Sequence, residues 1–223
     1  MDFQPRASIS VDNPKDFVLK NTATVKPTLV PEIRLNLADE TCPIWEKTVP
    51  QLEVFCTSEL FWAFAWAGGQ ALARYILDNP EIVSEQSVLD FGSGSGIVAI
   101  AAAKAGASQV IASDIDEYAA AAIEVNAKKN NVAVEVTQDN LIGCCGHWTT
   151  VLAAAVCYEK DMSLQVTDWL CSLADKGTKV FIGDAQRFYL PKNNLESVVK
   201  YSPPFLSPLE DTDLKNAQVW RVL

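Results

Sequence analysis

The chain has 223 residues, 49% of them hydrophobic, and its 28 acidic and 18 basic residues give a formal net charge of −10. It is long and apolar enough to bury one substantial core, but no segment supplies the basic stripe that neutralises phosphates, which excludes nucleic acid as a partner. No stretch is apolar for long enough to cross a bilayer or has the form of a secretory signal, and we expect a soluble, intracellular protein that does not bind membranes.

The amino-terminal part of the chain shows little regular periodicity. Residues 1–28 are polar with scattered prolines, so we expect a loose arm that docks on the domain. Residues 30–37 alternate apolar and polar side chains, which predicts a half-buried strand. Four aromatic residues between positions 61 and 66 then run into a Gly-Gly pair, after which residues 70–77 are predicted to be helical.

Strands and helices alternate from residue 87 onward. Strands are predicted over residues 88–91, 110–113, 132–137, 150–156 and 179–183, and helices over residues 97–105, 117–130 and 164–173. This rhythm is typical of the α/β class, in which helices cover both faces of a parallel sheet. A short helix near residues 195–199, a strand near residues 200–201 and a last strand over residues 218–223 complete the predicted elements.

The most informative segment ends the first of the alternating strands. Residues 88–96 read Val-Leu-Asp-Phe-Gly-Ser-Gly-Ser-Gly, so an apolar strand runs into a loop that offers a ligand bare backbone. A dinucleotide fingerprint needs two residues between its second and third glycines, whereas only Ser95 separates Gly94 from Gly96. The spacing therefore excludes NAD.

Acidic side chains also end the next two strands. Asp114 follows one strand, where a carboxylate can accept both hydroxyls of a ribose, and Gln138-Asp139 follow the other, placed to accept from an adenine amino group. Together with Asp90 ahead of the glycine loop, they suit S-adenosylmethionine, which carries a sulfonium, an ammonium and a ribose but no phosphate. A phosphate site would favour lysine or a bare helix amino terminus. The alternative for Asp90 and Asp114 is a helix cap or a solvated strand end.

A glycine loop, a ribose acid and an adenine acid on three consecutive strand ends resemble the cofactor site of class I S-adenosylmethionine-dependent methyltransferases. From about residue 30 to the carboxyl end, the chain is similar to the protein-lysine methyltransferases that modify the electron transfer flavoprotein beta subunit. The segments that carry this resemblance are residues 31–35, 61–66, 68–75, 98–107, 183–184 and 187–191.

The resemblance implies a Rossmann-like seven-strand sheet, mostly parallel with an antiparallel last strand, with helices on both faces and an amino-terminal extension. Residues 1–85 would form that extension and contribute to the substrate side, and residues 86–223 would form the cofactor-binding core. It implies that the cofactor is S-adenosylmethionine and that the protein substrate is the electron transfer flavoprotein beta subunit. The residues expected at the cofactor are Asp90, Gly92, Gly94, Gly96, Asp114, Asp139 or Asn140, and Trp66.

After the fourth strand the family has an acidic-x-x-aromatic motif that should hold the incoming lysine. Here the motif reads Ala155-Val156-Cys157-Tyr158, so the aromatic residue is present and the acid is not. A lysine amine is unprotonated in only roughly one molecule in a thousand or fewer at neutral pH, and a carboxylate would orient the ammonium and help its proton leave. With Ala155 and Tyr158 at the catalytic positions we predict a slow or defective enzyme. Either the acid has been substituted, or a nearby carboxylate replaces it: Glu159, Asp161 or Asp184.

The leading hypothesis is therefore a protein-lysine N-methyltransferase that acts on electron transfer flavoprotein. The alternatives are methylation of ribosomal protein L11 and a cofactor-binding module that is catalytically silent. A single histidine, His147, and six cysteines without a Cys-x-x-Cys pair indicate no metal site. We expect the cytoplasm as the compartment if the source is bacterial and the mitochondrial matrix if it is eukaryotic.

Overall fold

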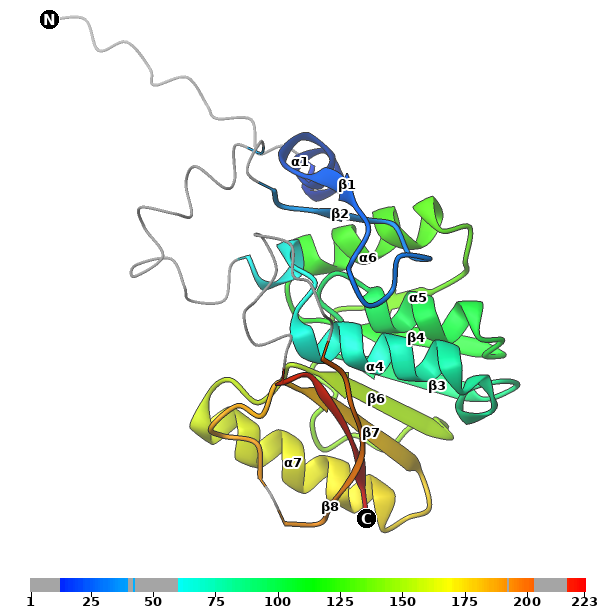
Figure 1. Cartoon of the computed structure of the whole chain (residues 1–223), viewed down its shortest axis with the longest axis vertical. Helices are drawn as coiled ribbons and strands as arrows, with labels where there is room; N and C mark the ends of the chain where they lie inside the picture. Colours follow the sequence, from blue (N-terminus) through cyan, green and yellow to red (C-terminus); the bar gives the residue numbers. More distant parts are fainter. Residues whose placement is uncertain (1–12, 40–41, 43–59, 192, 203–215) are drawn as a thin grey trace, which may run out of the picture.

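The computed structural model describes residues 13–39, 42, 60–191, 193–202 and 216–223 (Figure 1). Its centre is a seven-stranded sheet with the order β5-β4-β3-β6-β7-β9-β8. The strands from β5 to β7 run parallel, whereas β9 is antiparallel to both of its neighbours. This confirms the mostly parallel sheet with an antiparallel last strand. The strands are β3 (Ser87–Phe91), β4 (Gln109–Ser113), β5 (Glu135–Thr137), β6 (Thr150–Ala154), β7 (Lys179–Asp184), β8 (Leu195–Lys200) and β9 (Gln218–Val222).

Helices cover both faces of this sheet, as predicted (Figure 1). Successive strand residues point to opposite faces, so Val88 and Leu152 pack with α4 and α5, whereas Leu89 and Val151 pack with α7. Both faces of each central strand are therefore apolar, which explains why the strands read as continuous hydrophobic runs. The helices are α4 (Ala67–Asp78), α5 (Ile97–Lys104), α6 (Glu117–Lys129) and α7 (Lys160–Ala174), with short 3-10 turns η1 (Phe61–Ala63) and η2 (Pro80–Ile82).

Several of the predicted elements differ from the structure. The half-buried strand expected over residues 30–37 is limited to β2 (Leu35–Leu37), whose three residues are all buried. The helix expected near residues 195–199 is wrong, because this segment is strand β8, paired antiparallel with β9. Two adjacent β-branched residues, Val198 and Val199, suit a strand better than a helix, and the pairing with β9 decides the outcome. The strand expected over residues 132–137 is limited to its last three residues in β5.

The amino-terminal segment is more ordered than a loose arm. Helix α1 (Pro14–Asn21) begins at Asn13, whose side chain accepts a hydrogen bond from the Lys15 backbone, and it is followed by an antiparallel pair, β1 (Ala23–Val25) and β2 (Leu35–Leu37). Val18 of α1 is fully buried against α6, which explains why this segment folds onto the core. The segment docks on the domain as expected, but it is not loose over residues 14–28, and residues 1–12 lie outside the described part of the chain.

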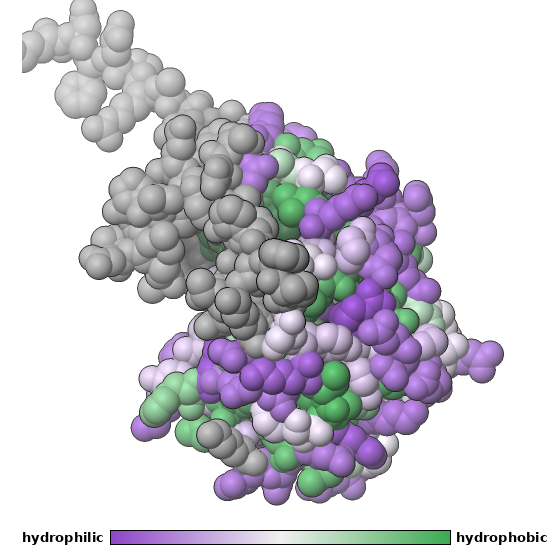
Figure 2. All heavy atoms as spheres, viewed as in Figure 1, coloured by the Kyte–Doolittle hydropathy of each residue, from purple (hydrophilic) through white to green (hydrophobic). Residues whose placement is uncertain are grey.

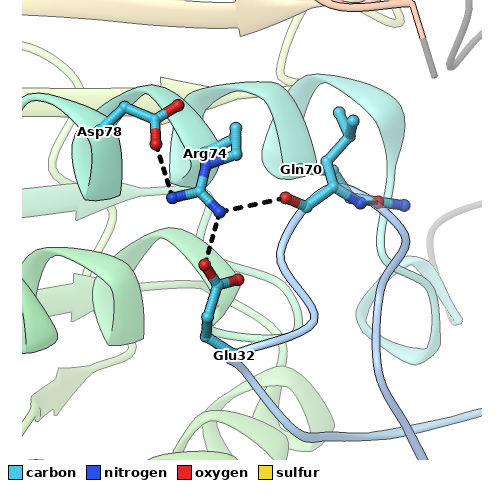
Figure 3. A network of polar contacts seen from close by, with 5 residues as sticks. Glu32, Gln70, Arg74 and Asp78 are labelled. Carbon is cyan, nitrogen blue, oxygen red and sulfur yellow. Dashed lines mark hydrogen bonds and ion pairs between the residues drawn. The ribbon is translucent and has the colours of Figure 1, made fainter.

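Arg74 of α4 holds the segment that precedes β2 (Figure 3). Its guanidinium lies 2.7 Å from Glu32 Oε1 and 2.7 Å from Asp78 Oδ1, and it also donates to the Leu29 carbonyl. The hydrogen bond from Arg74 lowers the pKa of Glu32. Gln70, one turn earlier in α4, accepts a hydrogen bond from the Leu29 backbone at 3.1 Å. Residues 31–35 and 68–75, which both carry the family resemblance, are thus in direct contact through Glu32 and Arg74.

The first turn of α4 rests on the backbone of β7. A Cβ atom on Gly68 would overlap the carbonyl group of Gly183, and a Cβ atom on Gly183 would overlap the carbonyl group of Gly68. Only a pair of glycines permits this close approach. It places Trp66, which directly precedes α4, at the carboxyl end of the sheet.

Hydrophilic residues cover most of the described surface on the face drawn in Figure 2, and hydrophobic residues form small groups between them. Among the residues that the structure describes, no helix combines the length and the apolar character needed to cross a membrane.

The contact between α4 and β7 predicts that Gly68→Ala destabilises the fold. The added methyl group meets backbone atoms that cannot turn away, and overpacking of this kind costs about 1–3 kcal/mol of unfolding free energy. The matched control is Gly69→Ala, whose methyl group would meet only the Ile97 side chain, at 3.1 Å. Urea denaturation should show a clear loss of stability for the first variant and a much smaller change for the second. Equal stability of the two variants would contradict the proposed contact.

Candidate active site

A cavity of about 900 Å³ lies at the carboxyl ends of β3, β4 and β6. These three strands are neighbours in the sheet, with β3 in the middle, although β3 and β4 follow each other in the chain and β6 comes later. The chain therefore turns away from β3 in both directions, and such a switch point is where α/β sheets bind ligands. The start of α4, helix α6 and the turn η1 complete the walls.

The glycine loop forms the floor of the cavity. Gly92, Gly94 and Gly96 all have positive φ angles, of 64°, 53° and 81°, which residues with side chains rarely adopt. The amides of Gly92 and Ser93 donate to the Ser113 carbonyl at the end of β4, so the loop is tied to the neighbouring strand. Gly92 and Gly94 line the cavity, whereas Gly96 is not among the described lining residues and is instead the N-cap of α5.

Asp90 is the last residue but one of β3, beneath this loop, and is 1% exposed. Its Oδ2 accepts hydrogen bonds from Ser93 Oγ at 2.5 Å and from the Ala99 backbone at 2.9 Å. Burial raises the pKa of Asp90 to about 7, with a smaller contribution from the charge of Asp114 and against the hydrogen bonds from Ser93 and Ala99, which lower it. The side chain thus joins the strand, the loop and the first turn of α5.

Asp114, at the end of β4, is the second carboxylate of the cavity. Its Oδ2 accepts from the Gly94 amide at 2.9 Å and its Oδ1 from the Asp116 amide at 3.1 Å. Burial raises the pKa of this carboxyl as well. Two partly desolvated carboxylates beside one cavity favour a ligand that carries positive charge.

The two candidates for adenine recognition are separated by the structure. Asn140 lines the cavity, whereas Asp139 is not among the described lining residues. The Asp139 carboxylate instead accepts a hydrogen bond from Thr137 Oγ1 at 2.8 Å, and its carbonyl accepts one from Ser113 Oγ at 3.2 Å. Of the two, Asn140 is therefore the residue in reach of a ligand.

Trp66 stands in the aromatic wall on the other side of the cavity. Its ring lies 5.7 Å from Phe61 and 5.6 Å from Phe64, measured between ring centroids. The guanidinium carbon of Arg187 lies 5.3 Å from the Trp66 ring centroid, within the range of a cation–π contact. Tyr158 contacts Phe61 at 5.0 Å, so this wall reaches from η1 to the segment after β6.

Sequence reasoning missed a second aromatic group at the cavity, formed by Phe17, Trp62 and Tyr118. The Phe17 and Tyr118 rings lie 5.0 Å apart, and the Trp62 ring stacks on Tyr118 at 6.5 Å. These residues come from α1, η1 and α6, which are far apart in the chain. No spacing rule connects them, so no signal in the sequence could have grouped them.

Ala155 and Tyr158 both line the cavity directly after β6. Ala155 has a φ of 56°, in the left-handed region where aspartate and asparagine are several-fold enriched over other residues with side chains. Its amide donates to the Gly183 carbonyl at 2.9 Å, which holds this conformation. The backbone at position 155 is therefore one that an aspartate adopts more readily than the alanine present.

The three carboxylates that could replace the missing acid differ in position. Glu159 and Asp161 are exposed and line the cavity, whereas Asp184 is fully buried and lies outside the described lining. The Asp184 carboxylate accepts a hydrogen bond from the Arg187 amide at 2.7 Å, so it holds the turn after β7. Among the described residues that line the cavity, six are acidic and one, Arg187, is basic.

Comparison with known proteins adds to this geometry. Residues 70–153 match the family model described as Ribosomal protein L11 methyltransferase (PrmA). The chain is 36% identical over 224 residues to the electron transfer flavoprotein beta subunit lysine methyltransferase of Xenopus laevis, covering 97% of this chain and 89% of the relative. It is 35% identical to the Homo sapiens protein of the same name, covering 92% and 80%.

Among solved structures, the fold is similar to that of magnesium protoporphyrin IX methyltransferase from Synechocystis PCC 6803 with bound SAH. The TM-score is 0.52 at 16% sequence identity, and the match covers 70% of this chain and 82% of that chain. At this identity the likeness concerns the fold.

The raised pKa of Asp90 predicts a pH-dependent stability that Asp90→Asn removes. An unfolded aspartate titrates near pH 4, so the folded protein retains a proton on Asp90 between about pH 4 and pH 7 that the unfolded chain releases. The contribution of this proton to the unfolding free energy is fully present below pH 4 and is lost as the pH rises through about 7.

Between about pH 5 and pH 8 the parent should lose on the order of 2–3 kcal/mol of unfolding free energy relative to Asp90→Asn, because one pKa unit corresponds to about 1.4 kcal/mol. Denaturant titrations of both proteins at the two pH values measure this difference. Asp168→Asn, on the exposed face of α7, is the control and should follow the parent. Parallel pH profiles for the parent and Asp90→Asn would contradict the buried, protonated carboxyl.

Proposed function

Because the chain belongs to the family of electron transfer flavoprotein beta subunit lysine methyltransferases, we propose that it transfers a methyl group from S-adenosylmethionine to a lysine of that subunit. The observation that carries this proposal is the extent of the relationship, which covers nearly the whole chain. It includes the aromatic wall and the segments after β6 and β7 as well as the glycine loop. A relationship confined to the glycine loop would support only the cofactor.

The cavity suits S-adenosylmethionine, which supplies a methyl group activated by a positively charged sulfur. Two carboxyl groups whose pKa values are raised by desolvation, Asp90 and Asp114, and an acidic lining favour such a cation and disfavour phosphate. In this proposal the glycine loop holds the methionine part, Asp114 the ribose and Asn140 the adenine. Trp66 flanks the cofactor and helps to exclude water.

On the acceptor side, the chain has to bind a lysine, orient it and let its proton leave. Tyr158 is 39% exposed at the cavity and can present its ring to the lysine ammonium. Glu159 and Asp161 are the exposed carboxylates closest in sequence to position 155 that also line the cavity. Without a carboxylate at position 155, alignment of the amine in a water-poor cavity provides most of the remaining acceleration. The proposed enzyme is therefore slow.

The match to the ribosomal protein L11 methyltransferase model supports a second candidate, methylation of a ribosomal protein. That match ends at residue 153, before the positions 155–158 that would hold the acceptor. It therefore bears on the cofactor half, which methyltransferases with different acceptors share. A third candidate, a catalytically silent cofactor-binding module, follows from Ala155.

We predict that Ala155→Asp increases methyl transfer to purified electron transfer flavoprotein by at least about a hundredfold, the low end for a positioned acid or base. The left-handed backbone at position 155 accepts aspartate, and the new carboxylate would orient the lysine ammonium and help its proton leave. The matched control is Ala155→Asn, which has the same shape and backbone preference but no charge. Its activity should stay near that of the parent.

The measurement is transfer of labelled methyl groups, with calorimetric titration of S-adenosylmethionine for all three proteins. Equal labelling by all three would contradict a role for a carboxylate at position 155. Intact cofactor binding with no labelling, even by Ala155→Asp, would favour the silent module, and label in ribosomal protein instead would favour the second candidate. No cofactor binding by any of the three proteins would overturn the cofactor assignment.

A further inference from the structure

A turn that carries two aromatic residues stands beside the cavity, directly after β7. The Leu190 amide donates to the Arg187 carbonyl at 3.1 Å, so Phe188 and Tyr189 occupy the two corner positions of a hydrogen-bonded turn. Such corners ordinarily carry glycine, proline, asparagine, aspartate or serine. Here Phe188 is 93% exposed and Tyr189 39% exposed, and their rings lie 5.2 Å apart, edge to face. Local turn chemistry does not account for this pair.

Both ends of the turn are anchored in the protein. Arg187 stacks on Trp66 at the cavity, and its amide is held by the buried Asp184 carboxylate. At the other end Leu190 is 6% exposed and packs in the apolar cluster with α7. Ahead of the turn, the Gln186 side chain donates to Gln218 Oε1 of β9 at 3.0 Å. The backbone that carries the two aromatic rings is therefore fixed at both ends of the turn.

Among the large apolar side chains that the structure describes, Phe188 is the most exposed. Phe188 directly follows Arg187, which lines the cavity, and two further exposed side chains, Ile115 and Tyr158, line the same cavity. Exposed apolar groups gathered at one place typically mark an interaction site, and aromatic residues are the commonest energetic anchors of such sites.

The surroundings of these groups are acidic. Glu117, Glu159 and Asp161 are exposed and line the cavity, and the whole chain carries a formal charge of −10. A basic partner segment satisfies both features at once, because lysine and arginine have apolar stems that pack on aromatic rings and charged ends that face carboxylates. A neutral or acidic segment would leave the carboxylates without complementary charge.

We propose that the Phe188-Tyr189 turn is the docking anchor for the protein substrate, and that it binds the basic surface segment that carries the target lysine. This inference rests on the proposed function. Phe188 packs against the substrate outside the cavity, while Glu159 and Asp161 attract the basic side chains that flank the target lysine. The turn thus determines which protein is bound, and the residues of the cavity carry out the methyl transfer.

The test measures binding rather than methylation, so that Ala155 does not affect it. Purified electron transfer flavoprotein is titrated against the full chain by biolayer interferometry, with S-adenosylmethionine present. Phe188→Ala should weaken the affinity by about tenfold or more, as expected for an anchor residue, and Tyr189→Ala should have a smaller effect. The affinity of both variants for S-adenosylmethionine and their thermal unfolding should match the parent.

The matched control is Leu223→Ala. Leu223 is 64% exposed and follows β9, which runs antiparallel to β7, so it lies at the edge of the sheet opposite the cavity. The affinity of the Leu223→Ala variant for the flavoprotein should stay within about twofold of the parent's affinity, as expected for a surface residue outside the interface. Glu159→Gln should slow association and weaken its dependence on salt, because charges at the rim act mainly on the association rate.

Two outcomes would overturn the inference, and they can be told apart. If the parent binds the flavoprotein and Phe188→Ala binds it equally well, the docking anchor is wrong while the proposed function stands. If the parent binds S-adenosylmethionine but not the flavoprotein, the proposed substrate is wrong and the inference is wrong with it.

Discussion

The buried carboxylate of Asp90 is the interaction on which the rest of the site depends. One oxygen accepts hydrogen bonds from the Ser93 hydroxyl and from the Ala99 amide, so the end of β3, the glycine loop and the first turn of α5 are joined at one atom. A second carboxylate, Asp114, holds the Gly94 amide and thereby ties the loop to β4. Burying both groups raises their pKa values, and that cost is offset when a cation occupies the cavity.

This arrangement separates two tasks within one cavity. The glycine loop after β3, Asp114 after β4 and Asn140 after β5 line the side of the cavity suited to a nucleoside with positive charge. The segments after β6 and β7 bring Tyr158 and Arg187 to the side of the cavity where, in the proposed function, the acceptor lysine would enter. Position 155 lies on that acceptor side with its backbone in the left-handed region, so the conformation suited to aspartate is kept although its carboxylate is absent.

The amino-terminal segment belongs to this arrangement through specific contacts. Gly68 and Gly183 bring α4 against β7 and so place Trp66 beside Arg187, whereas Arg74 binds Glu32 and fixes the chain ahead of β2. The segments that carry the family resemblance are therefore the ones that meet in space. The same contacts explain why α1, which polarity alone suggested was loose, packs with Val18 in the core.

Local patterns in the sequence determined the alternating α/β core, the glycine loop and the acids that end three strands, because side-chain periodicity and the φ angles of glycine act within a few residues. The family resemblance, and no local pattern, indicated position 155 as the place of the expected acid. Tertiary structure alone decided the rest. It made residues 195–199 a strand by pairing them with β9, chose Asn140 over Asp139 at the cavity, and buried Asp184 away from it. It also grouped Phe17, Trp62 and Tyr118, and exposed Phe188 at the corner of a turn. These outcomes depend on contacts between residues far apart in the chain, and no local spacing encodes such contacts.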